Sequence, residues 1–361
     1  MRKTGRRWQR CIRSRVANLE KSSRGFVRQR VPFLLCRTET QQTQTVIGRC
    51  QSSSPCDQTK LKGYTMQLCT ELFSSFKVED KISVGNLELF PINASLLRQP
   101  ENTKSLPELM EAGAAIITEM SERGDVELAH VSNLSEFYLF IADGESLVGA
   151  KQNRIAQKSV IIPPHSSIEL PVNCVERSRW TSGMQGSFGK SDFALPPSAR
   201  ERKSSLLKNK MGSRIQASVW SSVDEIAAKH DTFSSTADLD EILHSSPEIA
   251  KSLDADGTKT IDCNGFVVFG AGRPFVELFY DQTVCKLHQA ASKRAWLADA
   301  CDTTDGSKTK QDAAALLEKL AVSKWSTEDP VGCETAFSSE EQNNGRLVMK
   351  DDAFVHGYFY S

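Results

Sequence analysis

Side chains that bind anions and hydroxyl groups are concentrated in one stretch near the middle of the chain. They bracket two short apolar runs, and the stretch contains Lys151, Gln152, Asn153, Arg154, Cys174, Glu176, Arg179 and Trp180. A guanidinium binds a carboxylate or phosphate through two parallel hydrogen bonds, and side-chain amides bind hydroxyls and carbonyls. The pattern predicts a polar pocket for an anionic, amide-bearing or ribose-bearing ligand.

Strand periodicity suggests how this stretch is arranged. If residues 166–176 form a strand, period two places Glu176 at the end of an apolar face that includes Cys174, and the same period over 148–156 aligns Gln152 with Arg154. A buried carboxylate must be paired, hydrogen-bonded or protonated. We therefore expect the two strands to be neighbours and Glu176 to meet Arg154 or Arg179. The alternative is an ion-pair network that only stabilises the fold.

Two carboxylates are candidates for acid–base chemistry. Glu145 or Glu176 would act as the general acid or base, with Arg154 and Arg179 holding an anion. Trp180 would stack on a base or cap the pocket, although a lone Trp is more often a core residue.

A cysteine nucleophile needs a base within reach and an electropositive setting. His356 and His130 are candidate bases for Cys174, but a Cys in an apolar strand face usually only packs. Other histidines, at positions 230, 244 and 288, fall on predicted helices without metal-ligand spacing, and no close Cys pair begins a zinc site. The residues predict no metal and leave any cofactor open.

Elements that must position these residues are short strands followed by helices. Strand patterns cover 81–92, where the strand should end at Pro91, and 115–120, 126–133, 136–144, 146–154, 159–164 and 167–176. A helix capped by Ser105 should end near Gly113, and further helices are expected at 198–210, 217–230, 237–245, 247–254, 283–302 and 311–323. Hairpins are expected at 265–280 and 346–360. The fold class is α+β, with a largely antiparallel β-rich N-terminal half and a helical C-terminal half that ends in a hairpin.

The first part of the chain differs in composition. Residues 1–37 contain twelve Lys or Arg and one acid, so the remainder carries 33 basic and 44 acidic side chains, a net charge of about −11. An acidic body argues against nucleic-acid binding, which needs a basic surface, and no apolar run is long enough to cross a membrane. We expect 1–65 to be a disordered extension and 77–361 to be one domain with a loop insertion at 230–262.

The ten cysteines and the lack of a signal peptide predict an intracellular, cytoplasmic protein. The alternative is a mitochondrial protein with a transit peptide at 1–37.

The stretch also resembles a known family. GESLVGAKQNR (144–154) and the later Cys174-Val-Glu176 and Arg179-Trp180 are similar to a domain of unknown function named for its association with ADP-ribosylglycohydrolases and rhodanese-like phosphatases. Trp220 and His356 are looser matches, and Asn173 and Arg177-Ser178 depart from the pattern. The resemblance would cover about 77–361 and implies a place in NAD or ADP-ribose metabolism, with no established catalytic residue.

Three hypotheses follow from these observations. The chain binds and acts on a nucleotide-derived metabolite, or it is a sensor or adaptor that binds one without chemistry, or it is a scaffold whose polar stretch is an internal ion-pair network. Whether it is an enzyme, and which protein partners it has, are left open by the residues. A concave pocket lined by the polar stretch would favour the first two hypotheses.

Overall fold

Strands from both ends of the chain form the largest sheet. The computed structural model describes residues 69–94, 97–180, 186–189, 191–254, 259–300, 306–340 and 345–361, so the expected extension at 1–65 lies outside the described residues. The sheet has nine strands in the order β1-β3-β13-β14-β18-β17-β16-β15, with β2 paired to β3. Its strands are β1 (Phe76–Val78), β2 (Ile82–Val84), β3 (Leu87–Ala94), β13 (Gly265–Phe269), β14 (Phe275–Phe279), β15 (Trp325–Glu328), β16 (Thr335–Ser339), β17 (Arg346–Lys350) and β18 (Ala353–Tyr360).

Two smaller sheets are formed by the intervening strands. The six-stranded sheet has the order β12-β8-β9-β11-β6-β5 and the three-stranded sheet the order β10-β7-β4. Their strands are β4 (Thr103–Ser105), β5 (Ala115–Glu119), β6 (Leu128–Asn133), β7 (Tyr138–Ile141), β8 (Ser146–Gly149), β9 (Arg154–Ala156), β10 (Val160–Ile162), β11 (Ser166–Cys174) and β12 (Phe188–Gly189). Pairing is antiparallel except between β4 and β7.

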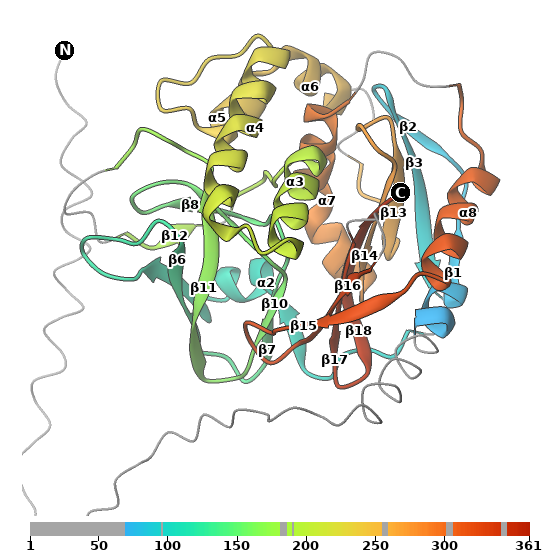
Figure 1. Ribbon diagram of the computed structural model, residues 1–361, viewed down its shortest axis with the longest axis horizontal. Coiled ribbons are helices and arrows are strands. Elements are labelled where there is room, and N and C mark those ends of the chain that lie inside the picture. The colour runs from blue at the N-terminus through green and yellow to red at the C-terminus, as the bar shows by residue number, and fades with distance from the viewer. Residues whose placement is uncertain are drawn as a thin grey trace, which may run out of the picture. The chain divides into compact units, whose positions relative to one another are not determined.

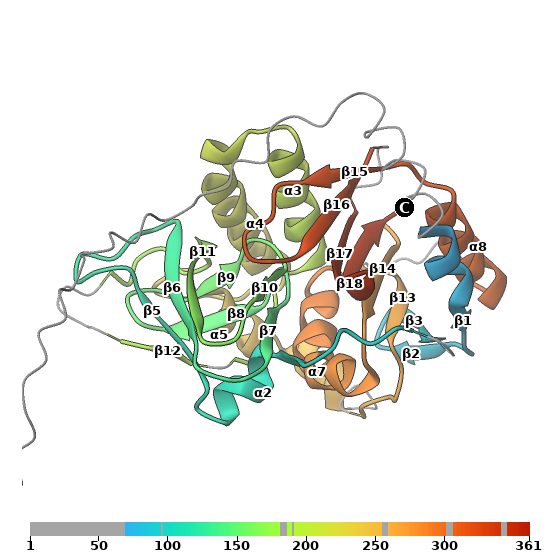
Figure 2. The ribbon, with the colours of Figure 1, turned by 90° about the horizontal axis from the view of Figure 1, so that it is seen from below.

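Helices cover the sheets and fill the space between them. They are α2 (Leu106–Glu111), α3 (Pro197–Lys208), the 3₁₀ turn η1 (Gly212–Arg214), α4 (Ile215–Lys229), α5 (Leu239–Ser245), α6 (Pro247–Ser252), α7 (Gln282–Ala298) and α8 (Lys310–Ala321). Figures 1 and 2 show the small sheets on one side and the nine-stranded sheet on the other, with α3 and α7 between them. Helix α4 contacts α3 and β11, α7 contacts β14, and α8 contacts β1.

Local sequence signals account for several element ends. Ser105 and Glu108 form the capping box of α2, which ends at Ala112 before Gly113 at φ +67°. The Asp281 carboxylate accepts the backbone amides of Thr283 and Val284 at the start of α7. These ends agree with the sequence-based expectations, as do the hairpins β13–β14 and β17–β18.

The α+β class is confirmed, but the expected division into a β-rich half and a helical half is not. Strand β3 pairs with β13, and β14 pairs with β18, so the N-terminal and C-terminal parts of the chain share one sheet. Strands β15 and β16 were not expected from the sequence. Helices α5 and α6 lie within 230–262 and agree with the helices expected at 237–245 and 247–254, while the loop insertion expected for this segment stays a prediction.

Two strand predictions are wrong in detail. Strand β3 does not end at Pro91 but continues to Ala94, and Pro91 lies opposite Phe266 of β13. The expected strand 146–154 is interrupted, because Gly149 at φ +118° and Ala150 at φ +46° turn the chain between β8 and β9. The predicted common face of Gln152 and Arg154 is therefore absent.

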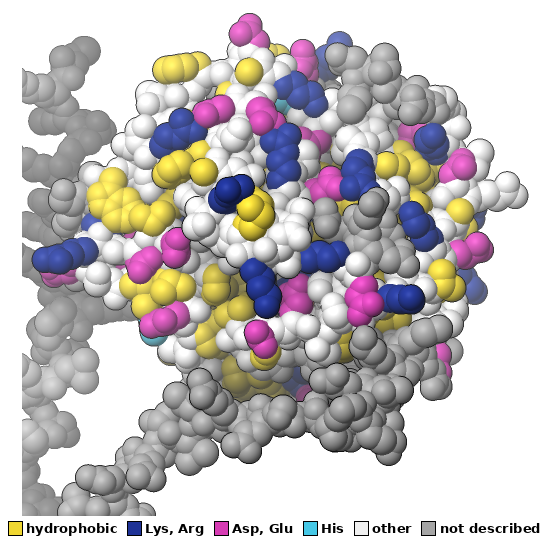
Figure 3. All heavy atoms as spheres, viewed as in Figure 1, with side chains coloured by type: hydrophobic (Ala, Val, Ile, Leu, Met, Phe, Trp, Pro, Cys, Tyr) yellow, Lys and Arg dark blue, Asp and Glu magenta, His cyan; other side chains and the backbone are white. Residues whose placement is uncertain are grey.

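Charges on the face seen in Figure 3 are interspersed. Lysine, arginine and acidic side chains alternate over it and leave no continuous basic surface. Among the described helices, none is both long enough and apolar enough to span a membrane.

Close pairing of β13 and β14 depends on Gly265. A Cβ at this position would collide with the Glu277 carbonyl oxygen and lie 2.9 Å from Leu278 Cα. Because backbone atoms cannot move aside cheaply, we expect Gly265→Ala to lower the free energy of unfolding by about 2 kcal/mol or more in urea unfolding. Gly212→Ala is the matched control, since nothing lies within 4 Å of its added Cβ, and it should change stability by less than about 0.5 kcal/mol. Equal effects of the two changes would contradict this account.

Candidate functional site

Residues Lys151–Arg154, the first part of the polar stretch, form the turn between β8 and β9 and the start of β9. Arg154 lies opposite Cys174 in the antiparallel pairing of β9 with β11, so the prediction that these strands are neighbours is confirmed. The Arg154 side chain is fully buried, donates from Nη2 to Glu119 Oε2 at 2.7 Å and from Nη1 to the Leu128 carbonyl at 2.8 Å. The carboxylate partner of Arg154 is therefore Glu119 of β5, an acid that the sequence reading did not consider.

Glu176 lies just beyond the end of β11 and is buried. Arg179 Nε donates to Glu176 Oε1 at 2.7 Å, and the Asn153 backbone amide donates to Glu176 Oε2 at 3.0 Å. Of the two arginines expected to pair with Glu176, Arg179 does so and Arg154 does not. Asn153 Nδ2 also donates to both carboxylate oxygens of Asp238, the N-cap of α5, at 3.0 and 3.1 Å.

Other members of the stretch are also engaged by protein groups. Gln152 Nε2 donates to the Arg177 carbonyl at 2.9 Å, and the Lys151 ammonium lies 5.6 Å from the ring centre of Trp180. Trp180 is 41% exposed and forms the rim of this region. The Arg177 guanidinium carbon lies over the face of the Trp220 ring, 5.4 Å from the ring centre. Trp220 is one of the two looser matches to the family pattern.

Cys174 is a packed thiol. Burial raises its pKa to about 11, although the Arg154 guanidinium opposes the shift. Gln216 of α4 hydrogen-bonds both the amide and the carbonyl of Cys174, at 2.9 and 2.8 Å, which fixes the end of β11. A nucleophile needs thiolate character, so this setting favours the packing interpretation.

A different group of residues lines a cavity of about 30 Å³ between the β7–β8 turn, α3, β14 and α7. Its polar lining includes Asp143, Glu145, Arg200, Glu277 and His288. Four buried atoms among them have no hydrogen-bond partner among the described residues, namely Arg200 Nε and Nη2, Glu277 Oε2 and His288 Nε2. Buried polar atoms in folded proteins are almost always paired with protein, water or ligand. The cavity has room for about two water-sized groups at roughly 10–15 Å³ each.

Glu145 and His288 form an acid–base pair at this cavity. Glu145 Oε2 accepts the Ala142 backbone amide at 2.9 Å, and Oε1 faces His288 Nε2 at 3.4 Å. His288 Nδ1 lies 2.9 Å from the Val284 carbonyl, which requires the proton on Nδ1 and leaves Nε2 facing the cavity. Burial by itself would lower the pKa of His288, but the Glu145 carboxylate outweighs it and raises that pKa.

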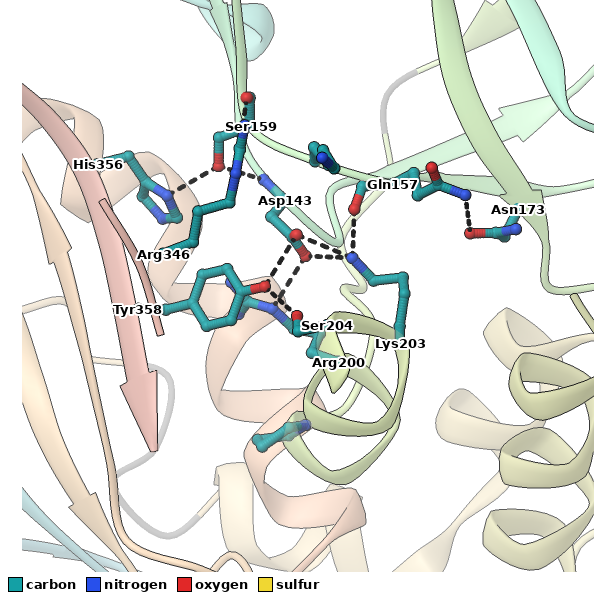
Figure 4. A network of polar contacts seen from close by, with 12 residues as sticks. Asp143, Gln157, Ser159, Asn173, Arg200, Lys203, Ser204, Arg346, His356 and Tyr358 are labelled. Carbon is teal, nitrogen blue, oxygen red and sulfur yellow. Dashed lines mark hydrogen bonds and ion pairs between the residues drawn. The ribbon is translucent and has the colours of Figure 1, made fainter. Parts of the chain in front are cut away.

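Arg200 connects the cavity to a buried charge network. Its Nη1 donates to Glu277 Oε1 at 2.7 Å and its Nε lies 3.5 Å from Asp143 Oδ1. Asp143 also accepts Lys203 Nζ at 2.8 Å on both oxygens and the Tyr358 hydroxyl at 3.1 Å (Figure 4). Burial lowers the pKa of Lys203 to about 8, although Asp143 opposes the shift. Burial would raise the pKa of Glu277, but Arg200 and His356 hold it at about 2.

His356 belongs to this second network and not to the polar stretch. Its Nδ1 lies 2.9 Å from Ser159 Oγ, and its Nε2 lies 3.7 Å from Glu277 Oε1. Burial lowers the pKa of His356 despite the nearby carboxylate, which favours a neutral ring. Phe279 lies between the two histidines, with its ring centre 4.9 Å from each.

One exposed trio in the described part of the chain has ligand atoms close enough to share a metal ion: Asp192, Asp240 and His244. Both nitrogens of His244 already face carboxylate oxygens, at 3.0 and 3.1 Å, and Arg294 lies 3.3 Å from Asp192. Ion pairs between these side chains explain the trio without a metal.

Comparison with known families supports the resemblance noted in the sequence. The model of the ARG and Rhodanese-Phosphatase-superfamily-associated Protein domain, ARPP-1, matches residues 75–360. The chain belongs to this family. Its name refers to association with ADP-ribosylglycohydrolase and rhodanese-phosphatase enzymes, and the domain itself is one of unknown function. No curated protein and no solved structure matches the chain.

The predicted site residues therefore fall into two groups in this ARPP-1 domain. Of the polar stretch, Asn153, Glu176 and Arg179 bond to one another, whereas Arg154 bonds to Glu119, and none of these residues lines the cavity beside Glu145. Glu145 is at that cavity, and His356 is joined to it through Glu277. The sequence reading missed Asp143, Arg200 and Glu277, and dismissed His288. Glu277 did carry a signal, because it is a single acid inside the apolar run FVELFY.

The Arg154–Glu119 pair provides a test of the structural role of the polar stretch. Arg154→Ala leaves the Glu119 carboxylate buried without its charge partner, and we expect it to cost about 3–5 kcal/mol of stability in urea unfolding. Arg177→Ala removes an exposed pair with Asp224 and should cost no more than about 1 kcal/mol. The double change Arg154→Met with Glu119→Met should recover much of the loss. A stable Arg154→Ala protein would mean that the pair is not essential to the fold.

The lowered pKa of Glu277 predicts that the stability of the protein falls at low pH. Its pKa is about 2 in the folded chain against an ordinary value of 4.5, so the stability it contributes is present above about pH 4.5 and is lost as the pH falls toward 2. Glu277→Gln should be less stable at pH 7 by on the order of 3 kcal/mol, and the difference should shrink across that window. Unfolding free energies of both proteins from pH 7 to pH 2 measure this, with the exposed Asp262→Asn as control. A difference that is independent of pH would contradict the assignment.

Proposed function

We propose that this domain binds an ADP-ribose-related metabolite at the cavity lined by Glu145, Arg200, Glu277 and His288, with its ribose hydroxyls inside. The observation that supports this is a set of buried atoms, all from residues that line this cavity, that have no hydrogen-bond partner among the described residues. Arg200 Nη2 is a donor and Glu277 Oε2 is an acceptor. A hydroxyl group both donates and accepts, so a pair of neighbouring hydroxyls can satisfy both atoms.

Charge and volume favour the sugar over the phosphates as the buried end. Three carboxylates line the cavity, from Asp143, Glu145 and Glu277, against the cations of Arg200 and His288. A phosphate would have to compete with these carboxylates for Arg200 and His288, whereas a neutral diol would not. Room for about two water-sized groups also matches two hydroxyls and leaves the rest of the ligand at the mouth.

The Glu145–His288 pair gives the same site a capacity for proton transfer. Protonated His288 can donate from Nε2 to a leaving oxygen, and Glu145 stabilises that protonated form. Glu145 keeps the acid–base role expected from the sequence, while His288 takes the place of Glu176 in the proposal. Chemical processing of the bound ligand requires a turnover assay as its test.

For the stretch Lys151–Arg179 we propose a structural role. Arg154 pairs with Glu119, Arg179 with Glu176 and Asn153 with Asp238, and a network of this kind fixes the β8–β9 turn. The sensor hypothesis applies if the cavity binds its ligand without turnover.

Thermal-shift titration of the full chain with ADP-ribose, ribose 5-phosphate and 2-deoxyribose 5-phosphate tests the binding proposal. A ligand at 100 times its dissociation constant adds about 2.7 kcal/mol of stability. We expect a shift with the two ribose compounds and binding at least tenfold weaker for the deoxy compound, because one buried atom stays unpaired. Glu277→Gln should weaken binding tenfold or more, and Asp262→Asn should not change it.

Turnover is tested on the same proteins by chromatography of ADP-ribose after incubation. Glu145→Gln keeps the hydrogen bond to Ala142 through its amide oxygen, so we expect it to retain binding within a few-fold and to lose at least 100-fold of any turnover. No shift with either ribose compound, or equal affinity for the deoxy compound, would overturn the proposal of a diol site.

A further inference from the structure

Two buried thiols face each other outside both polar networks. Cys263 lies just before β13 and Cys285 lies in the first turn of α7, and their Sγ atoms are 3.9 Å apart. Each residue is no more than 1% exposed. Helix α7 packs against β14, the partner of β13, which brings the two segments together (Figure 2). A disulfide holds its sulfurs about 2.05 Å apart, so this pair needs an approach of about 1.9 Å to bond.

Gln289 holds the two cysteine segments together. Its Oε1 accepts the Ile261 backbone amide at 2.8 Å, and its Nε2 donates to the Ile261 carbonyl at 2.5 Å. The same Nε2 lies 4.0 Å from each of the two sulfurs. Gln289 follows Cys285 by one turn on the same face of α7. One side chain of α7 therefore fixes the backbone that leads into Cys263 and keeps the two sulfurs in contact.

The two thiols differ in acidity. The S–H group of Cys285 donates to Cys263 and lowers the pKa of Cys263, an effect that burial opposes and the Lys293 cation supports. The same contact, together with burial, raises the pKa of Cys285. Lys293 is itself buried, and its Nζ donates to the Lys259 carbonyl at 2.5 Å. Because the thiolate is the reactive form of cysteine, Cys263 is the nucleophile of the pair and Cys285 keeps its proton.

We propose that Cys263 and Cys285 are a redox pair that a hydroperoxide converts into an intramolecular disulfide. The Cys263 thiolate attacks one peroxide oxygen, the O–O bond breaks, and Cys263 becomes a sulfenic acid. The other oxygen leaves as hydroxide and takes up the proton that Cys263 had released. The Cys285 sulfur then attacks the Cys263 sulfur, the S–O bond breaks, and the hydroxide leaves with the Cys285 proton as water. The two thiols lose two electrons in total, and the peroxide is reduced to two waters.

Two other buried cysteines have a different setting. Burial raises the pKa of Cys69 to about 12 and that of Cys174 to about 11, so both thiols are poor nucleophiles. Cys285, in contrast, lines a narrow pocket with Phe279 and Trp296 between the hairpin β13–β14 and α7. We assign this pocket as the route by which a small, neutral oxidant reaches the pair. The proposal does not depend on the diol site.

The test is treatment of the full chain with hydrogen peroxide at neutral pH, followed by blocking of the remaining thiols with N-ethylmaleimide in urea and by peptide mass spectrometry. We expect a cross-linked peptide that contains Cys263 and Cys285 and has lost the two thiol hydrogens, in the monomer band of a non-reducing gel. Dithiothreitol should restore both thiols. Cys69 and Cys174 are internal controls, and we expect N-ethylmaleimide to label both.

Single variants separate the attacking thiol from the resolving thiol. Cys285→Ala removes the resolving thiol, so we expect Cys263 to gain one oxygen slowly and to form no cross-link. Cys263→Ala removes the attacking thiol, so Cys285 should stay reduced. Two cysteines that only pack together would not show this asymmetry. If either variant does not fold, the cross-link in the parent protein and its two internal controls decide the question.

Lys293→Met tests the electrostatic support of the Cys263 thiolate. Loss of the cation should slow cross-linking about three- to tenfold at neutral pH and move the rise of the rate to higher pH, which loss of a purely structural lysine would not do. Lys310→Met, at an exposed lysine in a pair with Asp80, is the control for loss of one positive charge and should leave the rate unchanged.

Two results would overturn the proposal. One is the absence of the Cys263–Cys285 cross-link under conditions that oxidise the exposed Cys333. The other is oxidation of Cys69 or Cys174 as fast as that of the pair, because the contact between the two sulfurs would then confer no reactivity.

Discussion

The buried chain of charges Asp143–Arg200–Glu277 is the interaction on which the rest of the structure depends. Asp143 comes from the turn that follows the small-sheet strand β7, Arg200 from α3, and Glu277 from β14 in the nine-stranded sheet. Each charge would be costly to bury alone, so each requires the other two elements to be in place. This set of charges therefore joins the small sheets, the helices and the large sheet at one point.

Two polar networks in this domain differ in how completely their atoms are paired. Around Arg154 and Glu176, acids, amides and backbone carbonyls meet nearly every donor, although Arg154 Nε remains unpaired. Around Arg200 and Glu277, several buried atoms of residues that line one cavity have no hydrogen-bond partner among the described residues. A paired network stabilises a fold, whereas unpaired atoms at a cavity indicate a ligand or water. For this reason we place the proposed ligand beside Glu145 and assign the polar stretch a structural role at the β8–β9 turn.

Sequence alone determined the local elements and the family. Caps at Ser105, the hairpins at Ala271-Gly272 and Asp351-Asp352, and most helix limits follow from turn chemistry and periodicity over a few residues. The interruption at Gly149–Ala150 was missed because the apolar pattern continues across the turn and period counting does not register a positive φ. Tertiary structure alone decided which charges meet. Arg154 pairs with Glu119, which is 35 residues away in the chain, and Arg200 pairs with Glu277, which is 77 residues away. No local sequence pattern encodes such distant pairs. The site lies where strands from distant parts of the chain converge, so it depends on the sheet order, which propensity and spacing do not specify.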